Sequence, residues 1–511
     1  MPITELTSVQ IVDFLSRRAE RLLWAARRFS DEGLQCMFTR PLLGELLGEA
    51  TKMQELLDAY GARNNSRWFR FRLLVGAIKQ FSNIGYILLH LQHVLPSYRL
   101  LPIEEDFVQA SEFARSFVGG VLFRASRRLM SEADLLELPI PRDEPDEDSF
   151  LHEAPEGRLP GDRPARQIET VAETVTHLST AFLNLASECS MVHVARRARP
   201  EEYAQYLPEP VGEHALLDLR FKFHALQAMY DTYVQETETE DLDGDLPVLR
   251  GHISVVLHLI ETACEFAHYY ERHVLHTRRD VLDEALVDAE MLRQALMGYS
   301  IRFASLYISR ARELCQSMLK RYARVGEIQA SVPRYRGFHV RPSTLVAKIV
   351  HHYGSEVRMK IDDDLYDAAM PMDIFRANEK INAWKRKWLA SKIGALPVRD
   401  GTQAGDLPIN TVLRRLVLQL AEQGLLVIYE QPLELYDEPI HPDGTVLEQV
   451  TAELARLQAT GKVDIQSALN VTFIGDTRVL ADIRLLAENG YGEDNFGNNI
   501  DLPPQLAYVR R

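Results

Sequence analysis

Apolar positions recur at helical spacing through most of the N-terminal part of the chain. From residue 1 to about 137, and again from about 167 to 324, apolar residues return every three or four positions with charged residues between them, as in amphipathic helices. The intervening stretch, 138–166, holds six prolines and many acidic residues, which predicts an exposed linker. We therefore expect two helical domains, 1–137 and 167–324, on either side of this linker.

The pattern changes near residue 325. Ile328, Ala330 and Val332 alternate with polar residues, which predicts a strand. A helical apolar stripe follows and ends at Gly354, a residue type that commonly closes helices. A second alternating segment, an aspartate turn, a further strand and another helix come next. This order predicts an α+β domain over 325–435.

The remaining residues contain both helical and strand patterns. Residues 425–430, Leu-Leu-Val-Ile-Tyr-Glu, follow an amphipathic helix and have the pattern of a buried strand. Beyond them, residues 436–511 contain helical patterns at about 445–460 and 476–489, a strand-like segment between these, and a final loop. We expect a C-terminal α/β extension there.

Composition and charge exclude several classes of protein. The chain has 511 residues, 46% hydrophobic and 26% charged, with a net charge of -15. This charge argues against general nucleic-acid binding and against membrane attachment through basic residues. Four separated cysteines form neither a zinc cluster nor a disulfide framework, and we find no signal peptide and no membrane span. We expect a cytoplasmic protein with no membrane insertion.

Three weaker patterns do not support a metal or nucleic-acid site. The acidic loop around Asp241 lacks the glycine and the glutamate that a calcium-binding loop needs. Glu265 and His268 form one Glu-x-x-His motif, whereas a di-metal helical bundle needs two. Residues 384–388, Trp-Lys-Arg-Lys-Trp, fit a nucleic-acid groove or an ordinary surface helix. We expect the surface helix, with no bound metal, no cofactor and no nucleic acid.

The strongest candidate site is Gly-Phe-His-Val-Arg-Pro-Ser-Thr at 337–344. His339 stands just before a predicted helix that opens with Pro342, a favourable residue in a first helical turn. Free N–H groups and the positive end of the helix dipole would face a group bound to His339. Arg341 adds a forked cation and Thr344 a hydroxyl. A neutral imidazole can attack a phosphoryl group, so we predict a phosphohistidine; a histidine that only caps the helix is the alternative.

This segment resembles HPr, the histidine-containing phosphocarrier of the phosphoenolpyruvate sugar phosphotransferase system. The family pattern is Gly-Leu-His-Ala-Arg-Pro-Ala-Ser/Thr followed by an apolar helix. The chain matches it at Gly337, His339, Arg341, Pro342 and Thr344, with close replacements at Phe338, Val340 and Ser343. The resemblance covers 325–375 well and extends loosely to about 431.

The resemblance implies a fold and a set of roles. The fold would be an open-faced β-sandwich, an antiparallel sheet with helices on one face, and residues 425–430 would take the place of the family's fourth strand. His339 would accept the phosphoryl group, stabilised by Arg341 and the backbone amides of Val340 and Arg341. The second helix would add an apolar surface for partner docking, which we assign to Met370, Met372, Ile374 and Phe375.

The rest of the chain resembles no phosphoryl donor. We therefore expect the donor to be a separate protein similar to enzyme I, and the acceptor or effector protein is unknown. We expect a phosphocarrier or phospho-receiver that passes the phosphoryl group on, or uses it to regulate the helical region, and not a turnover enzyme. The first alternative is a non-catalytic structural or interaction protein with a degenerate HPr fold, and a weaker one is a helical metal-binding protein.

Overall fold

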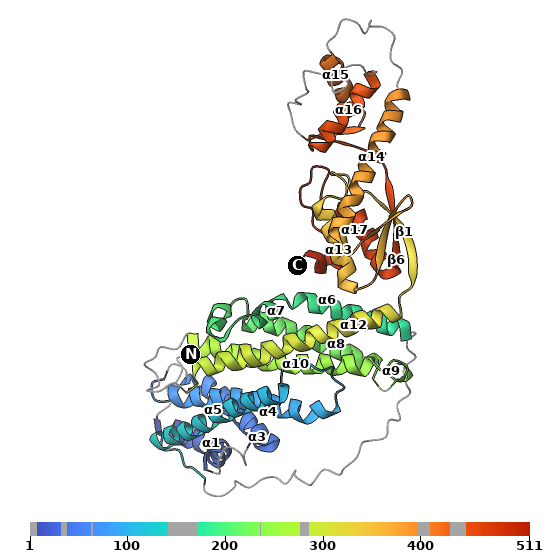
Figure 1. Ribbon diagram of the computed structural model, residues 1–511. Helices are drawn as coiled ribbons and strands as arrows, with labels where there is room; N and C mark the ends of the chain where they lie inside the picture. Colours follow the sequence, from blue (N-terminus) through green and yellow to red (C-terminus); the bar gives the residue numbers. More distant parts are fainter. Residues whose placement is uncertain are drawn as a thin grey trace. The chain divides into compact units, whose positions relative to one another are not determined.

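The computed structural model divides the chain into two compact units, Met1–Cys315 and Gln316–Arg511 (Figure 1). It describes residues 8–31, 38–62, 65–141, 171–235, 237–275, 286–395, 409–429 and 446–510. The first unit is helical, and the second combines helices with a small antiparallel sheet. The expected fold class, mostly helical with an α+β region in the C-terminal part, is confirmed at this level.

The first unit is built from long helices. Before the acidic stretch these are α1 (Ser8–Asp31), α3 (Arg40–Ala59), α4 (Phe69–Val94) and α5 (Phe107–Leu135). After it come α6 (Val171–Glu188), α7 (Ser190–Arg196), α8 (Glu213–Tyr233), α9 (Glu238–Leu242), α10 (Leu246–Tyr269), α11 (Ala289–Arg293), the π-helical η5 (Gln294–Ile301) and α12 (Arg302–Arg321). Residues 142–170, which include most of the predicted linker, lie outside the described residues.

Helices from both sides of the acidic stretch share one core. Phe81 of α4 packs edge-on against Tyr269 of α10, with ring centroids 4.9 Å apart, and Phe107 of α5 stacks parallel to Tyr299 at 6.0 Å. Gln80 of α4 also donates to the backbone carbonyl of Glu265, at 2.9 Å. The two helical regions that the sequence divides at 138–166 therefore belong to a single unit.

The second unit contains a four-stranded antiparallel sheet in the order β1-β6-β2-β3. Its strands are β1 (Val325–Ser331), β2 (Val357–Ile361), β3 (Asp364–Asp367) and β6 (Asn470–Asp476). Ile328, Phe473 and Met359 lie side by side across it and are buried, while Gln329 and Lys360 are exposed. This alternation, predicted for β1 and β2, means that one face of the sheet is covered.

Three helices supply that cover. They are α13 (Val340–Tyr353), α14 (Pro371–Ala395) and α17 (Thr477–Glu488). Helix α17 packs on β1 and β6, α14 packs on β2 and β3, and α13 contacts both helices. Gly354 ends α13 with φ +63°, as its position after the apolar stripe predicts.

The fourth strand of the sheet is β6, which corrects the expectation for residues 425–430. The strand at that place, β4 (Leu426–Ile428), pairs instead with β5 (Val463–Ile465) in a separate two-stranded sheet. Strand β6 pairs with β1 on one side and β2 on the other, so the boundary drawn at residue 435 cuts through this sheet. A short apolar strand satisfies the same pattern in either sheet, and only the pairing partners decide between them.

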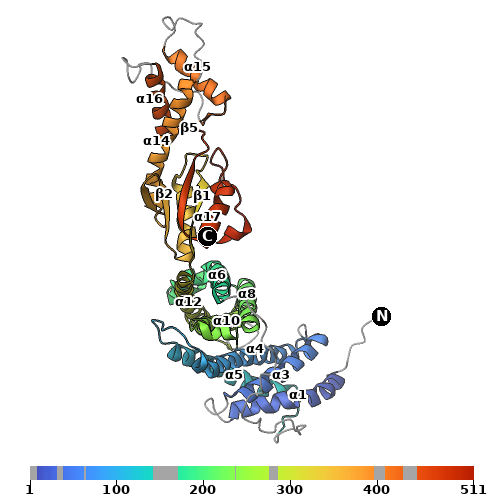
Figure 2. The ribbon, with the colours of Figure 1, turned by 90° about the vertical axis from the view of Figure 1, so that its right-hand side faces the viewer.

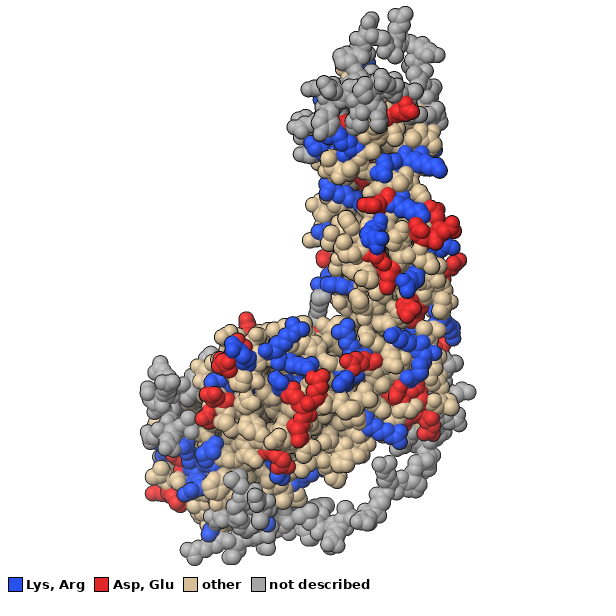
Figure 3. Space-filling model, viewed as in Figure 1, with Lys and Arg blue, Asp and Glu red and all other residues tan. Residues whose placement is uncertain are grey.

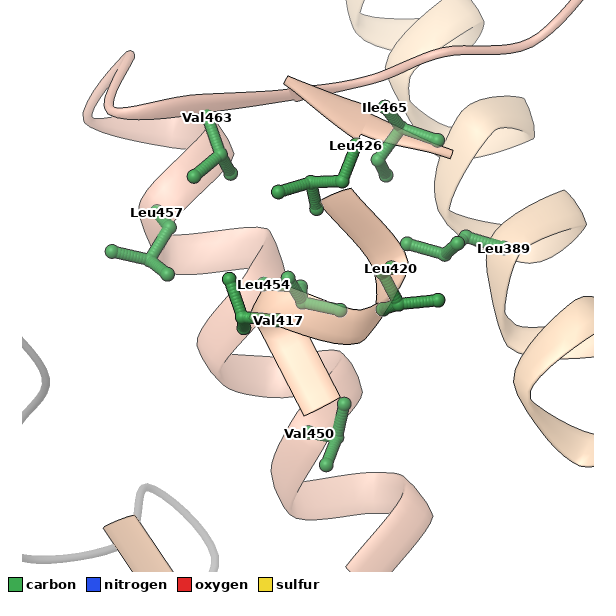
Figure 4. Close-up of a cluster of buried hydrophobic side chains, with 9 residues drawn as sticks. All are labelled: Leu389, Val417, Leu420, Leu426, Val450, Leu454, Leu457, Val463 and Ile465. Atoms are coloured by element: carbon green, nitrogen blue, oxygen red, sulfur yellow. The ribbon is translucent and has the colours of Figure 1, made fainter. Parts of the chain in front are cut away.

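The chain between α14 and β6 forms an inserted segment with its own core. Its described elements are α15 (Ile409–Glu422), β4, α16 (Val446–Ala459) and β5. Helix α14 extends beyond the sheet to reach α15 and α16 (Figure 2). The shared core consists of Leu389, Val417, Leu420, Leu426, Val450, Leu454, Leu457, Val463 and Ile465 (Figure 4).

Acidic and basic side chains are interspersed over the described residues of the face in Figure 3, so this view shows no extended basic surface. None of the helices that the structure describes combines the length and the apolar character needed to cross a lipid bilayer. Cys189, Cys264 and Cys315 are buried and take part in no disulfide among the described residues.

Candidate functional site

The loop that presents His339 is fixed by Asn378 of α14. The Asn378 side chain accepts a hydrogen bond from the Phe338 N–H (3.0 Å) and donates one to the Arg336 carbonyl (2.9 Å). Gly337 lies between these two contacts with φ +63°, and a Cβ there would come within 2.2 Å of Asn378 Oδ1. Only glycine fits this position. Because Phe338 is also fully buried, the backbone before His339 has little freedom.

Helix α13 begins at Val340, with His339 as its N-cap residue. The helix therefore starts two residues earlier than the position of Pro342 suggests. The Ser343 N–H donates to the His339 carbonyl at 3.2 Å, and Pro342 has no N–H. The N–H groups of Val340 and Arg341 are thus the two in the first turn without a helical acceptor. They lie next to His339 in the chain, where the sequence predicts N–H groups that donate hydrogen bonds to a phosphate.

A buried carboxylate faces the imidazole. His339 Nε2 lies 2.9 Å from both carboxylate oxygens of Glu493, whose side chain is 1% exposed against 22% for His339. Glu493 stands 154 residues away in sequence, in the loop after α17, and the sequence analysis missed it. The only local signal is an acidic residue in a segment rich in glycine and asparagine, and nothing in that pattern connects it with His339.

The carboxylate determines which ring nitrogen is free. A carboxylate at this distance accepts a hydrogen bond, so we infer that Nε2 holds the ring proton. In the neutral ring Nδ1 then keeps an unshared electron pair. Among the described residues, Nδ1 of His339 has no hydrogen-bond partner. The arrangement therefore leaves Nδ1 as the ring nitrogen with an available electron pair.

The other predicted phosphate ligands are engaged differently from the expectation. Arg341 Nη1 donates to the Gly497 carbonyl at 3.1 Å and lies 3.5 Å from Glu493 Oε2. Thr344 Oγ1 donates to the Val340 carbonyl at 2.7 Å, inside its own helix. In this conformation the Thr344 hydroxyl hydrogen is already used, and one arm of the Arg341 guanidinium is directed to the loop that contains Glu493.

Aromatic rings form a further side of the site. The Tyr335 ring stands perpendicular to the His339 ring, with centroids 5.4 Å apart, and contacts Tyr429 at 5.0 Å. The Arg336 guanidinium lies over both tyrosine rings. Burial, followed by the nearby Asp464 carboxylate, raises the pKa of Tyr429 well above its usual value. Tyr429 follows β4, so the inserted segment reaches the surroundings of His339.

The inserted segment is joined to the site through a buried ion pair. Lys385 Nζ lies 2.9 and 3.1 Å from the carboxylate oxygens of Asp464, and both side chains are almost fully buried. Asp464 also accepts from the Arg336 N–H at 3.1 Å. In the same basic segment, Trp384 donates to Asp362 at 3.2 Å. Lys385, the first of the two lysines in 384–388, therefore lies in the interior and is not available to a nucleic-acid groove.

The predicted docking residues do not all lie on the surface. Met370, Met372 and Phe375 are 54%, 65% and 42% exposed, whereas Ile374 is fully buried. Ile374 is followed on the inner face of α14 by the buried residues Ala377 and Ile381, at the spacing of a helix stripe. Its assignment to a docking surface was wrong, and the other three residues are accessible.

A polar pocket lies beside the histidine-rich helix α10 of the first unit. A pocket of about 380 Å³ is lined by Glu265 and His268, together with Lys79. Gln80 donates to Glu265 at 2.9 Å, and burial raises the pKa of that carboxyl. His268 Nδ1 pairs with Glu213 at 2.9 Å. Among the described residues, no group of three potential ligands could hold a metal ion.

Comparison of the chain with protein-family models, with curated proteins and with solved structures finds no match. The functional assignment therefore depends on the site itself. There, a histidine held by a buried carboxylate presents its second nitrogen at the start of a helix with two free N–H groups. This arrangement suits nucleophilic attack by the imidazole on a group that is negatively charged once it is bound, because the helix start stabilises negative charge.

Proposed function

We propose that this protein is a phosphocarrier or phospho-receiver in which Nδ1 of His339 accepts a phosphoryl group from a donor protein similar to enzyme I. The observation that carries the proposal is the contact between His339 Nε2 and buried Glu493, which leaves Nδ1 as the free nitrogen. The phosphoryl group is then passed to a further protein, or it regulates contacts of the helical unit. No cofactor is required for either role.

The transfer follows from ordinary phosphoryl chemistry. The Nδ1 electron pair attacks phosphorus in line, and the bond from phosphorus to the donor's leaving atom breaks, with its electron pair going to the donor. The ring becomes a phosphoimidazolium that keeps its proton on Nε2. The N–H groups of Val340 and Arg341 and the helix dipole stabilise the phosphoryl oxygens, and the Arg341 guanidinium adds charge.

Two features of the second unit support the proposal. The sheet β1-β6-β2-β3, covered by α13, α14 and α17, agrees with the open-faced sandwich that the resemblance to HPr implies. Exposed Met370, Met372 and Phe375, at the start of α14, offer a surface for the donor. The inserted segment, with its separate core, then lies between the second helix and the fourth strand of this fold.

Incubation with enzyme I and radiolabelled phosphoenolpyruvate tests the proposal. We expect the wild-type protein to gain a label that is lost in acid and stable in base, as for a phosphohistidine. His339→Ala should abolish the label, and His351→Ala, which changes an exposed histidine of the same helix, should retain it. A label that persists in His339→Ala would show that the acceptor is elsewhere.

A second candidate function is a structural or interaction protein that retains this fold without phosphotransfer. The specific observation in its favour is that the site is occupied by its own contacts. Arg341 is bound to Gly497 and lies near Glu493, and the Thr344 hydroxyl is bound within α13. Failure of the wild-type protein to take up label from either enzyme I or a small chemical phosphoryl donor would favour this function.

A further inference from the structure

We infer that Glu493 is the positioning residue of the acceptor histidine: it sets the tautomer of His339 and stabilises the positive charge that forms when Nδ1 takes a phosphoryl group. Only the second part of this inference, the stabilisation of the charge that forms on phosphorylation, rests on the proposed function. The first half, the tautomer, concerns the unphosphorylated protein and can be tested without any donor.

The loop around Glu493 is built to hold the carboxylate in place. Glu493 forms a β-bridge with Asn499, and the Ile500 N–H donates to the Gly492 carbonyl at 2.9 Å. The neighbouring Tyr491 is fully buried, and its hydroxyl donates to the Ser331 carbonyl at 2.8 Å, which ties the loop to the end of β1. The Glu493 side chain is therefore directed inward by a loop that is anchored on both sides of it.

The site also supplies Glu493 with partners for its charge. A buried carboxylate is costly unless cations or donors surround it. Glu493 has the His339 N–H at 2.9 Å and the Arg341 guanidinium at 3.5 Å. The Glu493 carboxylate is thus stabilised by a hydrogen bond from His339 and by the charge of Arg341, both of which belong to the acceptor site. Its energy therefore depends on the charge of the imidazole.

The change in the charge of the imidazole during phosphoryl transfer explains why a carboxylate on Nε2 accelerates the transfer. When Nδ1 forms its bond to phosphorus and the leaving group departs with the electron pair, the ring gains one positive charge and Nε2 keeps its proton. A carboxylate on Nε2 stabilises this cation more than it stabilises the neutral ring, as the aspartate of a serine-histidine-aspartate triad does. The stabilisation begins in the transition state, so it accelerates uptake of the phosphoryl group.

The experiment compares Glu493→Gln with wild type. Glutamine retains an oxygen that can accept from Nε2 but has no charge. The matched control is Asp501→Asn, which removes one charge from the same C-terminal segment at a side chain that is 99% exposed. The phosphoryl donor is phosphoramidate, which transfers its phosphoryl group to Nδ1 with loss of ammonia and requires no donor protein.

Two readouts are needed. Nitrogen NMR of the imidazole should show the Nε2-protonated tautomer of neutral His339 in wild type and in Asp501→Asn. Phosphorus NMR should show the His339 signal, identified by its absence in His339→Ala, growing about tenfold or more slowly in Glu493→Gln. Circular dichroism and thermal unfolding check that the variants fold, and Asp501→Asn should match wild type in rate.

The outcomes separate the inference from the proposed function. Equal phosphorylation rates in Glu493→Gln and wild type would overturn the role of Glu493 and leave the proposed function standing. A neutral His339 protonated on Nδ1 in wild type would overturn the role of Glu493 together with the choice of Nδ1 as the acceptor atom. An Nε2-protonated wild type with slowed Glu493→Gln, but with no uptake from enzyme I, would keep the inference and count against an enzyme I-like donor.

Discussion

Arg341 has contacts in the structure and a proposed role in binding the phosphoryl group, and the two must be compatible. Its guanidinium already binds the Gly497 carbonyl and approaches Glu493, while the proposed phosphoryl group would be a second anion on the same side chain. A guanidinium has five N–H donors in a fixed plane and can serve two acceptors at once. An ammonium group has the same charge without this geometry.

We therefore expect Arg341→Lys to fold normally yet to exchange phosphoryl groups poorly. Loss of one charge-assisted hydrogen bond, roughly 1.5–3 kcal/mol, corresponds to a change of about tenfold or more in rate. Arg341→Ala should be slower still. The measurement is the rate of phosphoryl gain and loss, with circular dichroism as the folding control, and wild-type rates in both variants would remove Arg341 from the site.

A second residue-scale prediction concerns Glu265 in the polar pocket of the helical unit. Burial raises the pKa of its carboxyl, so the folded protein holds this proton at a pH where the unfolded chain has lost it. When the pKa of a carboxyl is higher in the folded protein than in the unfolded chain, the free energy of unfolding falls as pH rises above the pKa of the unfolded chain. Glu265→Gln removes this penalty and keeps an oxygen that accepts from Gln80.

Glu265→Gln should therefore raise the unfolding temperature at pH 7 relative to wild type, and the gain should shrink toward pH 4. Thermal unfolding across this range provides the test. Glu104→Gln, at an exposed position, is the matched control and should leave the difference from wild type independent of pH. A Glu265→Gln variant that is less stable than wild type at pH 7 would contradict the prediction.

At the scale of elements, the junction between β1 and α13 depends on one glycine and one asparagine. Gly337→Ala must place a Cβ against Asn378 Oδ1 as well as adopt φ +63°. Gly424→Ala is the matched control, because Gly424 has φ +69° with no atom within 4 Å of the added Cβ. The difference between the two variants isolates the steric contact from the backbone strain.

We expect Gly424→Ala to cost about 1 kcal/mol from its left-handed backbone alone, and Gly337→Ala to cost at least about 1 kcal/mol more from the overlap. Urea unfolding measures both, and hydrogen exchange at the Phe338 amide reports locally. Asn378→Ala removes the overlapping atom, so the double variant should be less destabilised than the sum of the singles. Strict additivity would show that the overlap is relieved elsewhere.

At the scale of the whole molecule, each unit combines segments that are distant in sequence. Helices on both sides of residues 142–170 share a core in the first unit. In the second unit, the inserted segment between α14 and β6 has its own apolar cluster and is linked to the loop before His339 by Asp464. The Lys385–Asp464 pair is the charged part of this link.

Removal of one partner of that pair should have a large effect. Lys385→Met leaves the Asp464 carboxylate buried without its cation, which we expect to cost about 3–5 kcal/mol of stability. Lys380 lies on the same helix as Lys385 and pairs with the exposed carboxylates of Asp362 and Asp364. Lys380→Met breaks these solvent-exposed pairs, so it is the control and should change stability little. Urea unfolding of the full chain distinguishes them, and equal effects of the two changes would show that the buried pair is not structurally important.

Local features of this protein were predictable from the sequence by itself. The amphipathic helices, the alternating strands β1 and β2, the helix end at Gly354 and the position of His339 at a helix start all depend on residues within a few positions of one another. Helical and strand periods, left-handed glycines and caps act over this range. The local residue pattern is therefore sufficient to predict these features.

Only the tertiary structure decided the pairings between distant segments. It selected β6 over β4 as the fourth strand, turned Ile374 inward, joined the two helical regions and brought Glu493 to His339 across 154 residues. A strand pattern does not specify its partner, and a lone acidic residue in a loop does not specify what it faces. Such contacts are set by which apolar surfaces pack together, because burial of those surfaces stabilises the fold without regard to distance along the chain.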